Sequence, residues 1–313
     1  MNKKPTVTIF GLGRMGAQIA KRLHKNGFTV YGWNRSSDTD LVKQVKKSGV
    51  DTTNNLGEVV AKNSINQRIF WIMLPHAITD DFIFGKDHLG AFLKKGDIVI
   101  DGGNSFYKDS MRRAKLLSKK GIYFFDSGTS GGVWGEKNGF ALMVGGSKEK
   151  WNVVEPIFKT LSAGDNYAYL GNAGAGHFTK MIHNGIEYGM MEAIAEGYAV
   201  LDASPFKLNL ADVTRVYQKG SVVRSWLVDL CRTIFEKEDV KNTSGKIDMN
   251  GEGEWTVTIG KELGVDVRVI ADAVAVRKES SDVKNQKKFS NKIVALMRKQ
   301  FGGHEIHTTK KKK

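Results

Sequence analysis

A glycine-rich turn between a strand and a helix, close to the start of the chain, constrains the fold more than any other feature. The apolar run Thr6–Phe10 is typical of a buried strand, and Gly11-Leu12-Gly13-Arg14-Met15-Gly16 follows it directly. Ala17–Asn26 then has helical periodicity, and Gly27 ends the helix. In this setting the glycines permit a tight turn, and the helix N-terminus offers N–H groups to a pyrophosphate. We therefore expect a dinucleotide-binding domain whose cofactor contacts include Gly11, Gly13, Arg14, Met15 and Gly16.

The alternation of strands and helices continues through the first half of the chain. Further strand-like runs lie at Phe28–Trp33, Arg68–Leu74, Ile98–Ile100 and Ile122–Phe125. Past Gly171 the strand signals fade and helical periodicity takes over. The sequence therefore predicts an α/β fold with two domains. Residues 1–172 form a doubly wound Rossmann-type sheet, and residues 173–313 form an all-helical substrate and oligomerisation domain with a C-terminal tail.

Composition narrows the class of protein. The chain has 313 residues, enough for two domains, and its single cysteine, Cys231, excludes an intrachain disulfide. It shows no secretory signal and no apolar stretch of membrane-spanning length, so we expect a cytoplasmic protein without a membrane partner. The net charge of +15, four of it in Lys310–Lys313, favours anionic partners. Because zinc spacing and RNA-binding signatures are missing, small anions are favoured over nucleic acid, and no metal is expected.

The end of the second predicted strand bears on the choice of coenzyme. An NAD site usually has an acidic residue there, which accepts from the ribose 2′-hydroxyl. This chain has Asn34, Arg35 and Ser36 instead, and Arg35 can pair with a 2′-phosphate. We expect NADP, with NAD left open because Asp38 and Asp40 follow closely.

One face of a predicted helix carries an unusual set of polar groups. Lys180, His183, Asn184, Glu187 and Tyr188 follow the spacing i, i+3, i+4, i+7, i+8, which places them on one side of the helix. The apolar stripe that should face a core lies elsewhere on the segment, at Met181, Ile182, Ile186, Met190 and Ile194. The polar face is therefore predicted to meet a ligand.

Two polar loops follow predicted strands on the side where such sheets bind ligands. The first is Asp101–Ser105, in which Asn104 offers both a donor and an acceptor. The second ends in Ser130-Gly131-Gly132, where a hydroxyl and bare N–H groups suit a carboxylate. With the polar helix face, these loops are expected to define a cleft between the domains.

These motifs resemble the decarboxylating 6-phosphogluconate dehydrogenases, in the β-hydroxyacid dehydrogenase superfamily, and the chain looks like the shorter form. The resemblance runs from Val7 to His304. The glycine turn, the strand end Met73-Leu74-Pro75 and the helix from Lys180 to Asn184 are shared across the superfamily. The narrower signature comprises Asp101–Ser105, Ser130–Gly132, Lys180–Tyr188 and Phe301–His304.

The resemblance implies a role for each of these residues. Lys180 is the general base that takes the C3 hydroxyl proton, and Glu187 is the general acid that protonates C1 after decarboxylation. Asn104, His183 and Asn184 orient the hydroxyls, while Ser130, Gly131 and Gly132 hold the carboxyl end. The strand end contributes Met73, Leu74 and Pro75 to the cofactor site, beside Asn104. Tyr188 and Arg224 hold the phosphate, and Arg298 and His304 complete the site from a partner subunit. A homodimer, or a tetramer of dimers, follows.

One departure from the family and two rival functions stay open at this point. The segment Asn250–Trp255 carries glutamates where the long form has a Lys- and Thr-bearing phosphate loop. The nearer rival is a dehydrogenase of the 3-hydroxyisobutyrate or tartronate semialdehyde type, against which His183 and Glu187 argue. The farther rival is a non-catalytic NADPH-binding regulator, against which Lys180 and Glu187 argue.

Overall fold

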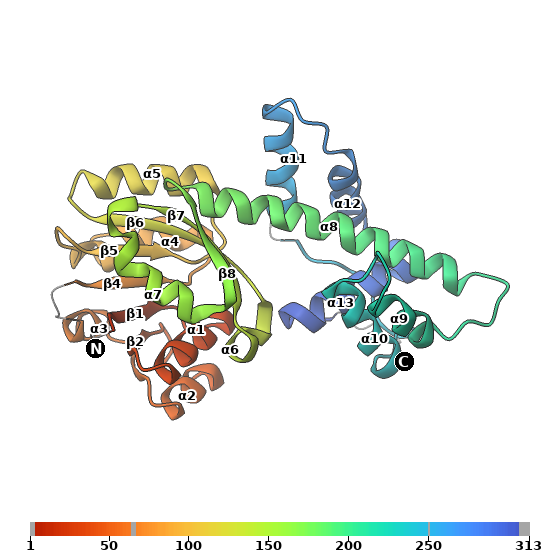
Figure 1. Ribbon diagram of the computed structural model, residues 1–313, viewed down its shortest axis with the longest axis horizontal. Helices are drawn as coiled ribbons and strands as arrows, with labels where there is room; N and C mark the ends of the chain where they lie inside the picture. Colours follow the sequence, from red (N-terminus) through yellow and green to blue (C-terminus); the bar gives the residue numbers. More distant parts are fainter. Residues whose placement is uncertain (1–3, 64–66, 250, 307–313) are drawn as a thin grey trace. The chain divides into compact units, whose positions relative to one another are not determined.

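The structure is a computed structural model and describes residues 4–63, 67–249 and 251–306. Asn250 and the terminal lysines Lys310–Lys313 lie outside the described residues. The chain divides into two compact units, Met1–Met181 and Ile182–Lys313. The division falls inside a single helix, α8 (Ala175–Asp202), so no loop separates the units (Figure 1).

An eight-stranded sheet forms the centre of the first unit (Figure 1). The strand order is β3-β2-β1-β4-β5-β6-β7-β8, and only β6 and β7 pair antiparallel. The strands are β1 (Thr6–Phe10), β2 (Thr29–Trp33), β3 (Asp51–Thr53), β4 (Ile69–Ile72), β5 (Ile98–Asp101), β6 (Tyr123–Ser130), β7 (Phe140–Gly146) and β8 (Ser162–Gly171). The predicted doubly wound, mostly parallel sheet is confirmed, although β3, β7 and β8 were not foreseen.

Helices cover both faces of the sheet because successive strand side chains point to opposite sides. Ile69 and Trp71 of β4 enter one apolar core, and Phe70 and Ile72 enter the other. The first core is closed by α1 (Arg14–Lys25), α2 (Asp40–Lys47) and α7 (Trp151–Leu161). The second is closed by α3 (Leu56–Lys62), α4 (His76–Phe84) and α5 (Tyr107–Ser118). A short helix, α6 (Gly135–Asn138), lies beside α1, where the Glu136 backbone N–H donates to Gln18 Oε1 at 3.0 Å.

The glycine turn between β1 and α1 needs its glycines for different reasons. Gly11 has φ of +94°, which side chains rarely adopt, and a Cβ on Gly16 would overlap the Gly11 carbonyl oxygen. A Cβ on Gly13 would meet no protein atom within 4 Å. The local fold therefore requires glycine at positions 11 and 16. At position 13 no protein atom requires it, so a ligand that approaches the turn is the remaining reason for a glycine there.

The second unit is helical. Besides the C-terminal part of α8 it contains α9 (Leu210–Gln218), α10 (Trp226–Lys237), α11 (Glu252–Glu262), α12 (Arg268–Glu279) and α13 (Phe289–Gly302). Its core gathers Met191 and Tyr198 of α8, Cys231 of α10, Val274 of α12 and Leu296 of α13. Within the described ranges, no helix is long and apolar enough to cross a membrane.

The apolar stripe expected on α8 is only partly buried. Met181 is buried and Ile194 packs against the core of the second unit. Ile186 and Met190, however, are 52% and 41% exposed. The expectation that this whole stripe faces a core was therefore wrong for Ile186 and Met190, because residues on another face of the helix, Met191 and Ala195, supply the contacts to the core.

Candidate active site

The carboxyl edge of β1, β2 and β4 builds a compact surface around the glycine turn. Asn34, after β2, accepts the Leu12 N–H through Oδ1 at 3.0 Å and donates through Nδ2 to the Ser36 carbonyl at 2.8 Å. Its amide therefore shapes the turn itself. Met73, after β4, donates its N–H to the Phe10 carbonyl at 2.8 Å. Arg35 is exposed at the same edge, next to Asn34.

The α1 N-terminus at this edge fits a pyrophosphate. Gly13 occupies the N-cap, where it has no side chain to occupy the first N–H groups of the helix, and the first turn carries no acidic residue. The open space beside Gly13 lets a ligand reach those groups. The glycine turn, Arg14, Met15 and Met73-Leu74-Pro75 are thus positioned to hold a dinucleotide.

A buried ion network holds the loop that carries Asn104. Asp101 is fully buried at the end of β5, and its Oδ2 accepts from Arg113 Nη1 at 2.7 Å and from Ser105 Oγ at 2.8 Å. Asp101 Oδ1 accepts the Gly103 N–H at 3.1 Å. Arg113, itself buried on α5, also donates to Asp80 at 2.6 Å. The network fixes the loop on both sides of Asn104, which is exposed. Sequence reasoning missed Arg113, although a lone arginine on the apolar side of α5 was a usable signal.

Asp126 of β6 anchors the start of α8. Its two carboxylate oxygens accept the N–H groups of Gly174 and His177, each at 2.7 Å, and the side chain is fully buried. Next along β6, Gly128 lies so close to Lys180 that a Cβ there would overlap the Lys180 side chain. The Ser130–Gly132 segment follows two residues later, with φ of +132° at Gly131 and +55° at Gly132. Within the first unit, β6 thus positions both Lys180 and this loop.

The remaining polar residues of the α8 face belong to the second unit. His183 Nδ1 lies 3.0 Å from Asn184 Oδ1 and 3.8 Å from Glu187 Oε2. The imidazole is therefore placed between the amide and the carboxylate. Lys180 and Glu187 are seven residues apart on one continuous helix, which separates their backbones by about 10 Å.

A buried arginine that was not foreseen contacts Tyr188, and the charge of a second buried arginine acts on both residues. The guanidinium carbon of Arg277, on α12, lies 3.2 Å from the centroid of the Tyr188 ring. Arg298, on α13, is also buried, and burial followed by the nearby charge of Arg277 lowers its pKa. Burial raises the pKa of Tyr188. Two buried cations beside a phenol are suited to an anion such as a phosphate ester. A sequence signal existed, because Arg277 interrupts the apolar face that Ala273 and Val274 form on α12.

Arg224 and Arg298, the two arginines expected at the phosphate, lie in different surroundings. Arg224, expected to hold phosphate, is exposed in the turn before α10, and Arg277 is the arginine that contacts the Tyr188 ring. Arg298 was expected to come from a partner subunit. Within its own chain, α13 packs on the core of the second unit, and the charge of Tyr188 acts on the pKa of Arg298. The contribution of Arg298 to a partner's site stays a prediction. His304 packs its ring against Phe301, at 6.3 Å between centroids.

The glutamate-bearing segment also approaches Tyr188. A Cβ on Gly253 would lie 2.6 Å from the Tyr188 ring, so the start of α11 packs against the phenol. Glu252 is buried there, and its charge contributes to the raised pKa of Tyr188. A carboxylate thus lies near the Tyr188 phenol, on the segment where the long form has its phosphate loop.

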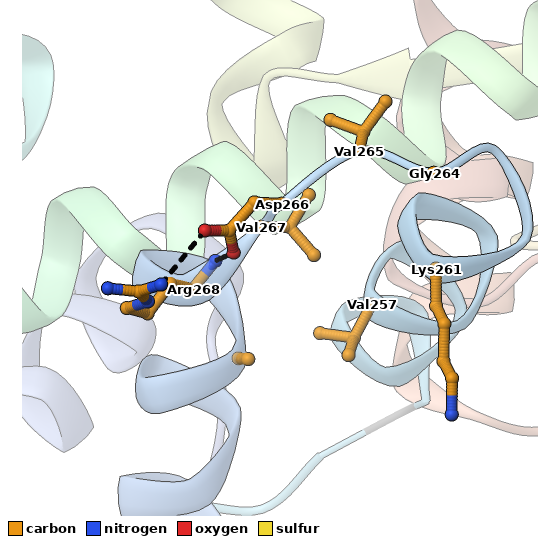
Figure 2. A pocket seen from close by; sticks show the side chains of 8 residues that line it. Val257, Lys261, Gly264, Val265, Asp266, Val267 and Arg268 are labelled. Atoms are coloured by element: carbon orange, nitrogen blue, oxygen red, sulfur yellow. Dashed lines mark hydrogen bonds and ion pairs between the residues drawn. The ribbon is translucent and has the colours of Figure 1, made fainter.

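A hollow at the other end of α11 is a separate feature of the second unit. It has a volume of about 420 Å³, and Figure 2 shows Val257, Val265 and Val267 on its wall, with Asp266 bonded to Arg268. Asp266 accepts the backbone N–H and a guanidinium N–H of Arg268, both at 3.1 Å. Since Asp266 and Arg268 satisfy each other, Lys261 is the one further charged residue on the wall and most of the wall is apolar, this hollow has no evident chemistry. In the part of the chain that the structure describes, no group of three or more His, Cys, Asp or Glu side chains could hold a metal.

A dinucleotide-binding sheet, followed by a helical unit and joined to it by a helix with a lysine and a glutamate on one face, is the arrangement of a pyridine-nucleotide-dependent dehydrogenase. A family model described as the NAD binding domain of 6-phosphogluconate dehydrogenase matches residues 6–171. A second, described as the C-terminal domain of 6-phosphogluconate dehydrogenase, matches residues 176–313. The chain belongs to the 6-phosphogluconate dehydrogenase family.

Individual relatives agree with this assignment. Bacillus subtilis YqeC, provisionally named a 6-phosphogluconate dehydrogenase, is 40% identical over 299 residues, covering 95% of this chain and 98% of YqeC. An NAD(+)-dependent, decarboxylating 6-phosphogluconate dehydrogenase of Haloferax volcanii is 33% identical, covering 95% and 97%. The solved Plasmodium falciparum 6-phosphogluconate dehydrogenase has a TM-score of 0.78 and 28% identity, covering 88% of this chain and 62% of that one. The chain thus spans shorter relatives almost completely and about three fifths of the Plasmodium enzyme.

Proposed function

We propose that this protein oxidises and decarboxylates 6-phosphogluconate to ribulose 5-phosphate and CO₂, with NADP as the preferred oxidant and NAD as an alternative. The single observation that carries the proposal is the polar face of α8, where Lys180 and Glu187 offer a base and an acid on one rigid element. A module that only binds NADPH has no use for that pair.

The coenzyme part of the proposal rests on the edge around the glycine turn. Gly11, Gly13 and Gly16 would admit the pyrophosphate, and Arg35 would pair with the 2′-phosphate. The bound coenzyme supplies a hydride acceptor for C3 of the substrate.

The chain's own residues then handle the protons. Lys180 takes the C3 hydroxyl proton as C3 becomes a ketone, and its ammonium stabilises the oxygen when the carboxylate leaves as CO₂. Glu187 gives a proton to C1 of the resulting enediol, which completes ribulose 5-phosphate. His183, 3.8 Å from Glu187 and 3.0 Å from Asn184, orients the acid and the substrate hydroxyls. Asn104 and the Ser130–Gly132 segment would orient the C3 hydroxyl and the carboxylate from the first unit.

The phosphate end of the substrate would lie at Tyr188. Arg277 and Arg298 supply two positive charges there, both shielded from water. Because the segment at Tyr188 carries the buried Glu252 instead of a cation, we infer that the two arginines, and not this segment, provide the affinity for phosphate.

Assembly into a homodimer, or a tetramer of dimers, belongs to the same proposal. The second unit leaves large apolar side chains exposed, among them Val222, Val223 and Trp226 around Arg224, and Ile186 and Met190 on α8. Large apolar side chains left exposed in number are typical of protein interfaces. A second copy would cover them and bring Arg224 into a contact. The single cysteine is compatible with work in the cytoplasm.

One assay tests the reaction. Purified protein is mixed with 6-phosphogluconate and either NADP or NAD, and NADPH or NADH absorbance is followed together with CO₂ release. Gluconate tests the need for the phosphate, and 3-hydroxyisobutyrate tests the nearer rival. Reduced coenzyme with stoichiometric CO₂ supports the proposal. Reduction without CO₂, or turnover of 3-hydroxyisobutyrate alone, contradicts it.

A further inference from the structure

A buried acid lies behind the arginine that faces Tyr188. Glu192 follows Tyr188 by one helical turn on α8 and is 6% exposed, and Arg277 on α12 is 2% exposed. Their nearest charged atoms, Glu192 Oε1 and Arg277 Nε, are 3.7 Å apart. The pair lies wholly within the second unit and directly under the proposed phosphate site.

This pair is poorly satisfied. Among the described residues, neither carboxylate oxygen of Glu192 has a hydrogen-bond partner, and neither does Arg277 Nε. The other buried pair, Asp101 and Arg113, contrasts with it, since those groups meet at 2.7 Å and Asp101 has further donors. A buried carboxylate without hydrogen bonds destabilises the fold, and a neutral side chain of the same shape would cost less. Fold stability therefore does not explain Glu192.

We propose that Glu192 is a positioning residue that sets the effective charge and orientation of Arg277, so that the substrate phosphate binds more tightly when Glu192 carries a proton. The inference rests on the proposed function, because it assumes that the anion at Tyr188 is a phosphate ester. Glu192 itself need not touch the substrate.

The charges around the pair set the direction of the effect. Glu192 faces Arg277 from α12 and Glu196 from its own helix, and Arg277 also faces Tyr188 and Glu187. Arg298 of α13 adds a second positive charge near Arg277. Burial raises the pKa of Glu192 to about 7, although Arg277 opposes that shift. Both protonation states are therefore populated near neutral pH.

The sign follows from linkage. Below pH 7 Glu192 is neutral, and the full charge of Arg277 is available to an anion. Above pH 7 the Glu192 carboxylate partly neutralises Arg277 and repels a phosphate. Binding of a phosphate dianion must in turn raise the pKa of Glu192, so the complex takes up a proton. Affinity then falls as the pH rises through 7.

The test uses the full-length protein and compares wild type with Glu192→Gln, which mimics the protonated acid. Calorimetry gives the Kd of 6-phosphogluconate and of sulfate at several values between about pH 6 and about pH 8.5. The charge of the sulfate dianion does not change over this range. Its binding therefore reports titration of the protein without titration of the phosphate ester. Wild type should lose about tenfold in affinity for each unit by which the ligand raises the pKa of Glu192. Glu192→Gln should lose this dependence while keeping the affinity that wild type has at low pH.

Glu196→Gln is the matched control, since it removes an exposed carboxylate one turn further along the same helix. Its pH profile should keep the wild-type shape, displaced slightly at most. If Glu192→Gln does not fold, wild type alone decides the matter. Near pH 8, roughly two units above the ester pKa, its binding enthalpy should then depend on the buffer in the sense of proton uptake.

The outcomes separate this inference from the proposed function. One outcome is that the protein shows no turnover but binds anions with a pH dependence that Glu192→Gln removes. That outcome refutes the proposed reaction and supports the inference about Glu192. A second outcome is normal turnover while wild type and Glu192→Gln share the same pH profile of anion affinity. That outcome, or normal turnover without proton uptake when wild type binds the anion, overturns only the inference about Glu192. If neither 6-phosphogluconate nor sulfate binds, both are overturned.

Discussion

The substitution Asp126→Asn should weaken the fold and the reaction together, because Asp126 joins β6 to the start of the helix that carries Lys180. Each of its oxygens accepts one buried N–H at 2.7 Å. Asparagine has a single acceptor oxygen, so either Gly174 or His177 loses its partner and faces an NH₂ group. Losing one bond to a charged group, with a buried N–H left unsatisfied, should cost about 2–4 kcal/mol of unfolding free energy.

The same substitution should lower kcat more than it changes the binding of the coenzyme. A shift of the α8 start displaces Lys180, and a misplacement of about 1 Å in a catalytic group costs roughly 10²-fold in rate. The glycine turn on β1 is not part of this contact, so the Kd of NADP should stay within about twofold of wild type, well under a tenfold step of 1.4 kcal/mol. The assays are urea unfolding, steady-state kinetics and coenzyme titration. Asp165→Asn, which removes an exposed carboxylate on β8, is the control. Unchanged stability and kcat in Asp126→Asn would refute the anchoring role.

Four further predictions concern chemistry, coenzyme, assembly and pH. Lys180→Ala should abolish turnover while NADP still binds, and near-normal kinetics would sink the mechanism. Arg35→Ala should weaken NADP binding roughly 10–100-fold by titration and leave NAD little changed; a wild type that prefers NAD would contradict this. Mixed Lys180→Ala and His304→Ala subunits should regain about one working site in two if His304 serves the partner's site, whereas no recovery after confirmed subunit exchange means one-chain sites. Glu192 has its folded-state pKa raised from 4.5 to about 7, so its contribution favours folding at low pH and is lost as the pH rises between these values. Glu192→Gln should therefore gain up to about 3 kcal/mol over wild type in urea unfolding at pH 8 relative to pH 4.5, and a constant difference would contradict the burial argument.

The sequence predicted those parts of the fold that depend on local patterns. Thr6–Phe10 and the glycine turn could be recognised because a buried strand, a turn and a helix follow one another within twenty residues. β3 was missed because it is a three-residue edge strand of polar residues, Asp51–Thr53. β8 was missed because it reads as a loop, with Gly164, Asp165 and Asn166 in a mostly exposed strand.

The candidate site was harder to predict wherever it depended on packing between distant segments. The face of α8 follows from helical spacing alone, and so does the proximity of His183 to Glu187. Arg277 could not be assigned in this way, since its place over Tyr188 depends on how α12 packs against α8. Arg298 illustrates the same limit, because its burial depends on how α13 packs on the core of the second unit.

The continuity of α8 restricts where insertions and deletions can occur in proteins of this kind. Lys180 lies before the division between the units and Glu187 lies after it, yet no loop intervenes. Inserting one residue between them would turn Glu187 by about 100° around the helix axis relative to Lys180, and the acid would leave the face of the base. Lineages descended from this protein should therefore carry no insertion or deletion between positions 180 and 187.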